Sequence, residues 1–420
     1  MVERKRFNDI LLKLLIVIVV FNGFLTNYLN IGDFRTGTLV CDAYLVLLVI
    51  YCVFIGPRYS KLKRSLRNVY TICFVMFFLV LLVGVLAYSS LYQTIAGIRN
   101  HVLYISVYMI VVCLLGGSDP QEIFRFLLVC MMMICGFAIA QYAFRSVLPE
   151  KLLIVQGATG FTIFGVSDYR CTGLVGDMLA MGSFANMTLV LLALYLYDSG
   201  QALRRYLWCL LPITAGILTF SRASIGLGCA LIFMLVFLYF LQRRDKTALI
   251  LMGATFIALF AVLLTPFGQR ILLRFLPNET NIGSDAGRFG SYLAALNAIA
   301  GHPLLGLGFG TQMPSGTGGI RIVTDGHLWE CLLEMGIPLF LAMLVFYLST
   351  LLLSIRNRRK PPCRLYCAAF IILLVYYLIV SVFNSALDAR SNMCILMILL
   401  GFVVSSVNNC EDPAPKPDYQ

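Results

Sequence analysis

The chain has 420 residues, of which 60% are hydrophobic and only 12% are charged. This composition, with a mean hydropathy of +0.89, excludes a water-soluble globular fold as the main architecture. The net charge of +12 does not indicate a nucleic-acid partner, because the Lys and Arg residues stand in short clusters between apolar runs and thus resemble topology determinants.

The apolar runs are predicted to form transmembrane helices, since a backbone in hydrocarbon must satisfy its own hydrogen bonds and these runs lack the alternation of a barrel strand. About twelve runs qualify: 10–29, 39–56, 69–91, 101–117, 125–146, 173–197, 206–220, 225–241, 247–266, 329–353, 366–385 and 392–409. Most of the 14 cysteines fall inside these runs without the spacing of a metal site, so we expect small apolar side chains there and no metal.

The charge distribution predicts the orientation. Lys and Arg residues are roughly twice as frequent on the side of the N-terminus as on the other side, so both termini should be cytoplasmic. We expect residues 1–410 to form a single transmembrane domain and residues 411–420, with three prolines, to form a disordered cytoplasmic tail. The connection 266–328 is far longer than the others, and a long extracytoplasmic loop of this kind is more often functional than decorative.

Within this loop, an amphipathic helix is predicted between Asp285 and Ala300, resting on the outer leaflet. Its apolar stripe consists of Phe289, Tyr292, Leu293, Leu296 and Ile299, whereas Arg288 and Ser291 lie off the stripe. His302-Pro303 should end the helix, and the run of Gly306, Gly308 and Gly310 predicts irregular backbone after it.

Several arginines lie on the outer face, which the charge bias should deplete. They are Arg99, Arg170, Arg222, Arg288 and Arg321. Arg222 stands in a short turn, Phe220-Ser221-Arg222, between two apolar spans, where a guanidinium can bind a phosphate through a bidentate fork. The alternative is an arginine that only extends its charged end to the interface.

Asp325 and His327 stand where the long loop enters the tenth predicted span. Each is a candidate proton acceptor at the mouth of an outward cavity. The alternative is a polar helix N-terminus with Asp325 as its cap. The glycines of segments 287–292 and 301–308 hint only weakly at nucleotide binding, because no βαβ unit surrounds them.

The order of these motifs resembles that of the O-antigen ligase and polymerase superfamily. The resemblance rests on Ser221-Arg222 at a span junction, on Gly287-Arg288 with the downstream segment from His302 to Gly308, and on the segment from Glu334 to Pro338. The resemblance is strongest over residues 205–350. The number of predicted spans and the position of the longest loop near the end of the sequence extend the resemblance to most of the chain.

The resemblance implies an all-α, GT-C-like fold of about 12 transmembrane helices in the bacterial inner membrane, with its active face extracytoplasmic. It implies an oligosaccharide linked to undecaprenyl diphosphate as donor and an acceptor glycan, among membrane lipids and without a metal or another cofactor. Arg222 and Arg288 match the two motif arginines that such proteins place on the lipid diphosphate. Arg170 matches a further basic residue less closely.

The chain departs from the ligase pattern at the third motif, where Asp325-Gly326 replaces the usual His-Asn pair and His327 follows. This favours a polymerase of surface-polysaccharide repeat units, of the O-antigen or capsule type, with Asp325 or His327 as the base. A ligase that transfers the glycan to the lipid A core is the alternative.

A transporter or flippase is the alternative of another class. Ion-coupled carriers place ionisable groups near the bilayer midplane, often at an internal repeat. Here the ionisable residues of the spans all lie within about two turns of a predicted span end, and no repeat appears in the sequence. They are Lys13, Asp42, Asp177, Glu330 and Glu334.

Overall fold

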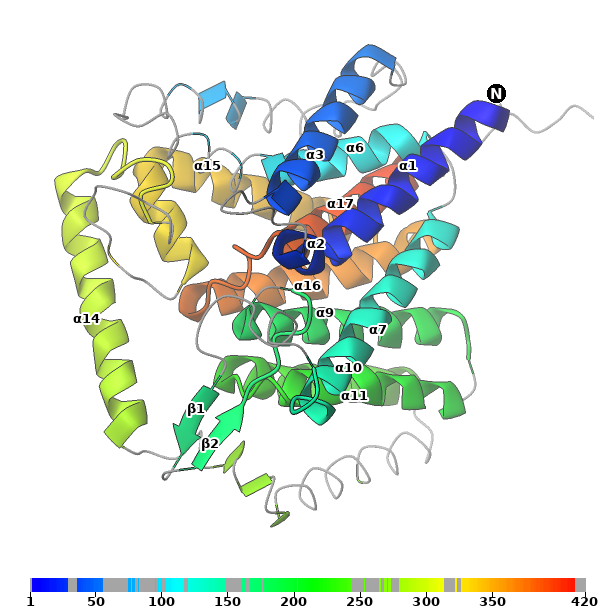
Figure 1. The fold of residues 1–420 in the computed structure, drawn as a ribbon. Coiled ribbons are helices and arrows are strands. Elements are labelled where there is room, and N and C mark those ends of the chain that lie inside the picture. The colour runs from blue at the N-terminus through cyan, green and yellow to red at the C-terminus, as the bar shows by residue number, and fades with distance from the viewer. Residues whose placement is uncertain are drawn as a thin grey trace, which may run out of the picture. The chain divides into compact units, whose positions relative to one another are not determined.

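The computed structural model shows a predominantly helical protein (Figure 1). It describes residues 2–28, 36–55, 103–116, 120–148, 160–163, 166–175, 177–201, 203–243, 279–312 and 326–411, with isolated residues between 75 and 99 and between 253 and 272, and Ile322. The chain divides into two compact units, Met1–Cys130 with Ser291–Gln420, and Met131–Gly290. That residues 1–410 act as one domain stays a prediction, and the tail 412–420 lies outside the described residues.

The described secondary structure consists of helices and one β-hairpin. The first unit contains α1 (Val2–Val20), α2 (Asn22–Tyr28), α3 (Thr36–Ile55), α6 (Tyr104–Leu115), α15 (His327–Asn357), η4 (Pro361–Cys363), α16 (Arg364–Phe383) and α17 (Arg390–Glu411). The second contains β1 (Gly160–Ile163), β2 (Val166–Tyr169), α9 (Met178–Asp198), η3 (Leu203–Cys209), α10 (Leu210–Ile217) and α11 (Arg222–Arg243). Two helices, α7 (Gln121–Ala143) and α14 (Glu279–Gly301), have residues in both units.

The helical prediction is confirmed except for the antiparallel hairpin β1–β2, in which Gly160 pairs with Tyr169. Two predicted spans, 69–91 and 247–266, lie mostly outside the described residues, and each of the others overlaps a described helix. Five described helices are long and apolar enough to cross a membrane, namely α7, α9, α15, the segment Pro361–Phe383 and α17. The chain is therefore a helical membrane protein, and the total of about 12 spans stays a prediction.

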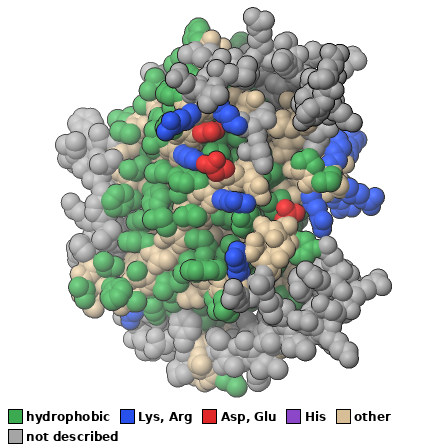
Figure 2. Space-filling model, turned by 90° about the vertical axis from the view of Figure 1, so that its right-hand side faces the viewer, with side chains coloured by type: hydrophobic (Ala, Val, Ile, Leu, Met, Phe, Trp, Pro, Cys, Tyr) green, Lys and Arg blue, Asp and Glu red, His purple; other side chains and the backbone are tan. Residues whose placement is uncertain are grey.

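The surface supports this assignment. Figure 2 shows hydrophobic side chains over much of one face, with Lys, Arg, Asp and Glu in small groups. On α3, Leu39, Leu47 and Phe54 are 61%, 62% and 81% exposed. Exposed apolar surface of this extent is costly in water but is favourable in contact with lipid.

The helix α17 is the centre of the first unit. Every residue from Ser391 to Val407 is buried, and the helix contacts α1, α6 and α16 (Figure 1). A helix that is apolar on all sides is expected to be buried among other helices. Because neighbouring helices surround α17, its first residues are held in place within the unit.

A buried ion network anchors that start. The guanidinium of Arg390 lies 2.7 Å from the Asp42 carboxylate, donates to the Tyr104 hydroxyl at 2.9 Å and donates to the Asn22 side-chain oxygen at 3.0 Å. The other Asp42 oxygen lies 3.7 Å from Arg99. Because a buried charge must be paired, these contacts tie α2, α3 and α6 to the first residue of α17.

The helix α15 is broken at Gly336, although its sequence predicted one continuous span over 329–353. Gly336 has φ 70° and ψ 175°, and Pro338 follows it. The break leaves the Leu333 carbonyl without its usual helical partner, and the backbone N–H of Leu307 donates to this oxygen at 2.6 Å. The run of glycines after α14 therefore docks on the broken turn of α15.

This docking is a contact of backbone with backbone. A Cβ atom added to Gly336 would lie 2.5 Å from the Leu304 carbonyl oxygen, and one added to Gly306 would lie 2.5 Å from the Leu333 carbonyl oxygen. Both glycines have positive φ angles, which other residues rarely adopt. The prediction of irregular backbone after His302 is thus confirmed.

The predicted helix in the long loop is confirmed as α14, but its apolar residues do not form one exposed stripe. Phe289, Leu293 and Leu296 are exposed, whereas Ile299 is 7% exposed and packs with Ala295 and Leu333. Tyr292 stacks on Trp329 with ring centroids 5.2 Å apart. One side of α14 therefore packs on α15. The adjoining apolar side is exposed on the surface, where it can contact lipid.

In the second unit, α9 packs against α10 and α11. Asp177 caps α9, because its carboxylate accepts the backbone N–H groups of Leu179 at 2.9 Å and Ala180 at 3.2 Å. The Asn186 side chain donates to the Ser224 carbonyl at 2.8 Å. This bond joins the middle of α9 to the first turn of α11, which is the turn that carries Arg222.

Replacing Gly336 by alanine should destabilise the protein by at least about 2 kcal/mol, because the new Cβ meets the Leu304 carbonyl and the backbone angles suit only glycine. Thermal unfolding of the full-length protein in detergent measures this, with a thiol-reactive dye that reports cysteines as they become exposed. The matched control is Gly290→Ala in α14, where nothing lies within 4 Å of the added Cβ. The control should keep or raise the melting temperature, and equal melting temperatures for the two variants would contradict the role of the break.

Candidate active site

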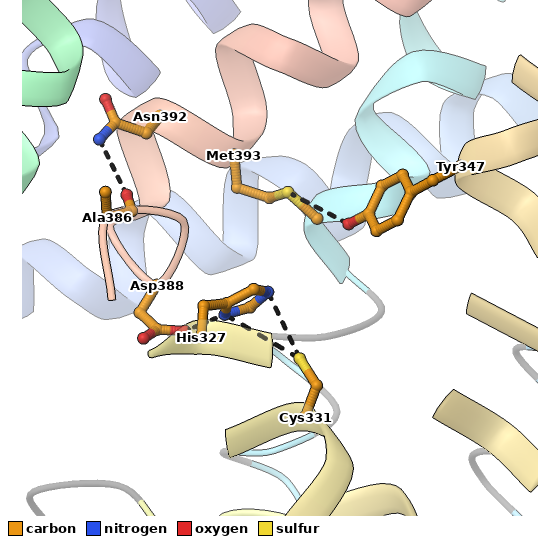
Figure 3. Close-up of polar contacts among 7 residues, drawn as sticks. All are labelled: His327, Cys331, Tyr347, Ala386, Asp388, Asn392 and Met393. Atoms are coloured by element: carbon orange, nitrogen blue, oxygen red, sulfur yellow. Dashed lines mark hydrogen bonds and ion pairs between the residues drawn. The ribbon is translucent and has the colours of Figure 1, made fainter. Parts of the chain in front are cut away.

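Of the two predicted proton acceptors, only His327 belongs to the described residues, and Asp325 lies outside them. His327 is the first residue of α15, and its Nδ1 shares a short hydrogen bond with Oδ1 of Asp388 (Figure 3). The side chains of His327 and Asp388 are 5% and 25% exposed. A buried imidazole bonded to a partly exposed carboxylate is a suitable acceptor for a proton, because the acid orients the ring and stabilises its charged form.

Two residues on the first turn of α15 extend this pair. The Glu330 carboxylate lies close to the pair, since the donor atoms of His327, Glu330 and Asp388 are all within 4.8 Å of one another. The Cys331 sulfur lies 3.4 Å from Nε2 of His327 (Figure 3). His327, Glu330 and Asp388 together are called the acid–imidazole cluster below.

The loop between α16 and α17 positions Asp388. The Asn392 side chain donates to the Ala386 carbonyl at 2.8 Å (Figure 3). The backbone N–H of Asp388 donates to the Ser385 carbonyl at 2.9 Å. The backbone N–H of His327 donates to the Asn384 carbonyl at 3.4 Å. The loop thus contacts both the backbone and the imidazole of His327.

Sequence reasoning missed Asp388 and Glu330 as members of the site. Asp388 lies 61 residues after its partner His327, and no spacing rule connects the two positions. One available indication was the polar segment Asn384-Ser385 through Asp388 to Asn392 between the last two spans, on the same predicted side of the membrane as His327.

In the second unit, Arg170 lies against the turn that carries Arg222. The Nε of Arg170 donates to the Thr219 carbonyl at 2.8 Å, and Arg170 is only 8% exposed. Phe220, in the same turn, is buried and has a positive φ of 50°. The backbone therefore bends sharply immediately before Ser221 and Arg222, and the structure brings two of the three predicted arginines to one region.

Cys171, the neighbour of Arg170, is not a candidate nucleophile. Burial raises the pKa of its thiol to about 12, although the Arg170 charge acts in the opposite direction. The thiol also donates to the Ala215 carbonyl at 3.7 Å. A neutral, buried thiol serves here in packing.

Arg288, the third predicted arginine, is half-buried in the middle of α14 and precedes Tyr292 by one helical turn. Arg288 and Arg222 belong to one compact unit and His327 to the other. That the three side chains meet in one cavity stays a prediction.

Residues 207–344 match a family model described as O-antigen ligase. This region of the chain is therefore similar to the O-antigen ligase family. The matched region begins within η3, ends within α15 and includes Arg222, Arg288 and His327, so the resemblance to the O-antigen ligase and polymerase superfamily is confirmed. Members of this family are membrane glycosyltransferase-like enzymes that act on lipid-linked glycans. No curated protein matches the chain.

The acid–imidazole cluster also has a donor set that can hold a metal ion. The donor atoms of His327, Glu330 and Asp388 all lie within 4.8 Å of one another. Imidazole and carboxylate oxygen are ligands of divalent transition metals. The sequence predicts no metal requirement, since guanidinium groups can provide the positive charge that a metal would otherwise supply.

Exhaustive treatment of the purified protein with EDTA should therefore leave its glycan-transfer rate unchanged within about twofold. The measurement compares the rates before and after chelation, and again after Mg²⁺, Mn²⁺ or Zn²⁺ is restored. A rate that collapses on chelation and returns with one of these ions would instead make the cluster a metal centre.

Proposed function

We propose that this protein polymerises lipid-linked repeat units of a surface polysaccharide at the outer face of the bacterial inner membrane. The donor is an oligosaccharide on undecaprenyl diphosphate, and the acceptor is a sugar hydroxyl on a second lipid-linked chain. The observation that carries the proposal is the pairing of His327 with Asp388, because His327 lies within the region that matches the O-antigen ligase family.

In the proposed reaction, the acceptor oxygen forms a bond to the anomeric carbon of the donor sugar. The bond from that carbon to the diphosphate oxygen breaks, and its electron pair leaves with the diphosphate. The hydroxyl proton passes to the pair of His327 and Asp388. Asp388 holds the imidazole in one orientation and offsets the positive charge that the ring gains.

The arginines bind the diphosphate in this proposal. The departing diphosphate gains negative charge in the transition state, and fixed guanidinium groups stabilise that charge at no cost of reorganisation. Arg170 fits this role because the Thr219 carbonyl holds its Nε and thereby limits rotation of the guanidinium plane. Arg222 follows in the same turn, and Arg288 is the third ligand.

The polymerase reading is favoured by the third motif, in which Asp325-Gly326 stands where ligases carry His-Asn. A ligase acting on the lipid A core is the second candidate, because the matched family model is described as O-antigen ligase. The two reactions use the same donor and differ in the acceptor. A transporter is less favoured, because ion-coupled carriers usually place their ionisable groups near the bilayer midplane, whereas His327 begins α15 and Asp388 lies in the loop between α16 and α17.

Replacing Arg288 by alanine should lower the transfer rate by about 100-fold to 1,000-fold, because one stabilising group for the diphosphate is lost. In cells, lipid-linked oligosaccharide of single-repeat length should accumulate on the outer face. Electrophoresis of the surface glycans and of the lipid-linked pool measures both effects.

The matched control is Arg145→Ala, which removes an exposed arginine of the same unit and should leave the glycan banding unchanged. Loss of surface attachment with normal chain length in the Arg288 variant would indicate a ligase instead. Accumulation of the lipid-linked unit on the cytoplasmic face would indicate a flippase.

Replacing His327 by alanine should lower kcat by about 100-fold to 10,000-fold, because the proton acceptor is lost. Asp388→Asn should also lower kcat by at least about tenfold and leave KM within about threefold, since asparagine keeps the size of the side chain but not its charge. Single-turnover rates with a purified lipid-linked donor separate the two constants.

The control for this pair is Cys331→Ser, which keeps the packing beside Nε2 of His327 and should keep kcat within about threefold. All three variants should have the melting temperature of the wild type within a few degrees. A normal kcat in the Asp388 variant would remove Asp388 from the mechanism.

A further inference from the structure

The turn between α15 and α16 is one of the most basic segments of the chain. Arg356, Arg358, Arg359, Lys360 and Arg364 stand within the nine positions 356–364. From Met335 to Leu387, the sequence contains no Asp or Glu. The part of α15 after Glu334, the turn and α16 therefore concentrate positive charge and contain no acid of their own to neutralise it.

A cavity of about 500 Å³ opens at this turn. Its lining consists of Arg358, Arg359, Arg364, Ala368, Ile371 and Ile372. Three guanidinium groups thus share a cavity with three apolar side chains. The acid–imidazole cluster lies at the other end of α15 and is separate from this cavity.

The charged and apolar parts of the lining are arranged in order along α16. Arg364, Ala368 and Ile371 follow one another at intervals of four and three residues, so they lie on one face of the helix with Arg364 at its beginning. The segment Pro361–Phe383 is long and apolar enough to cross a membrane. The apolar wall therefore runs from the charged end of the cavity toward the membrane interior.

The turn itself is rigid. The backbone N–H of Lys360 donates to the Asn357 carbonyl at 3.1 Å, and that of Cys363 donates to the Lys360 carbonyl at 3.0 Å. Pro361 and Pro362 begin η4, and their fixed φ angles reduce the freedom of the turn. The backbone that carries Arg358, Arg359 and Arg364 is thus ordered before any ligand arrives, which lowers the entropy cost of binding.

We propose that this cavity binds the phosphate headgroup of an anionic phospholipid, such as phosphatidylglycerol, with one acyl chain along Ala368, Ile371 and Ile372. Guanidinium groups form bidentate bonds with phosphate oxygens. Basic cavities between transmembrane helices are suited to anionic headgroups. A free phosphate ion would use the three charges but not the apolar wall, and for this reason the lipid is the favoured ligand. The proposal does not depend on the proposed reaction.

The test titrates the full-length protein in detergent micelles with phosphatidylglycerol and counts bound lipids by native mass spectrometry. One tightly bound phosphatidylglycerol per chain is expected. Phosphatidylcholine with the same acyl chains should bind at least about tenfold more weakly, because its headgroup has no net charge. Inorganic phosphate at equal concentration should not displace the lipid.

Two variants distinguish the cavity from general attraction to a basic surface. The triple change Arg358→Gln, Arg359→Gln and Arg364→Gln should weaken phosphatidylglycerol binding by about 100-fold, since each basic residue contributes about fivefold. The control Lys5→Gln, Arg6→Gln and Arg125→Gln removes the same charge elsewhere in the same unit and should leave binding unchanged within about twofold.

The change Ala368→Trp keeps all three arginines and fills the apolar wall, so it should also weaken lipid binding by at least about tenfold. Unfolding of each variant in lipid-free detergent shows that it is folded. Equal weakening by the two triple changes, normal binding to Ala368→Trp, or displacement of the lipid by inorganic phosphate would each overturn the proposal.

Discussion

The break of α15 at Gly336 is the constraint on which the arrangement of the first unit depends. It lets the loop after α14 donate to the Leu333 carbonyl, and it separates the half-helix that carries His327 from the long apolar part that follows. Glu334, only 1% exposed, strengthens the contact by accepting the backbone N–H of Gln312 at 2.9 Å. A buried carboxylate needs such donors, so the break and the loop stabilise each other. The direction of the half-helix, and with it the position of His327, follows from this contact.

Polar and charged contacts hold the loop between α16 and α17, which carries Asp388. Asp388 and Arg390 are separated by one residue, yet Asp388 bonds His327 of α15 whereas Arg390 pairs with Asp42 of α3. Two anchors that act in different directions leave little freedom to the loop between α16 and α17. Because the contacts of Arg390 with Asp42 are ionic and lie in surroundings of low dielectric constant, breaking them leaves a buried charge without its partner and is costly. The acid that faces the imidazole is therefore held by the same charges that hold the helices together.

The sequence alone predicted those features that depend on local composition. Apolar runs of about 20 residues predicted the helices, and the spacing of apolar residues predicted α14. Ser221-Arg222 was recognisable because a charged turn between two apolar runs is unusual. The break at Gly336 was missed, since a single glycine in an apolar run does not reveal a positive φ angle. Asp388 and the partner of Arg390 were missed because each contact joins distant segments, and helix packing, rather than any pattern in the chain, brings those segments together.

The acid–imidazole cluster also bears on the proposed role of His327 as a proton acceptor close to the membrane. A lone imidazole would become a buried cation, and the loss of hydration would oppose the transfer. In the cluster, the donor atoms of His327, Glu330 and Asp388 lie within 4.8 Å of one another, and Asp388 is hydrogen-bonded to the His327 ring. In the proposed reaction, the Asp388 carboxylate beside the ring would offset the positive charge that His327 gains, so the transfer would not leave an unpaired cation in a site of low polarity.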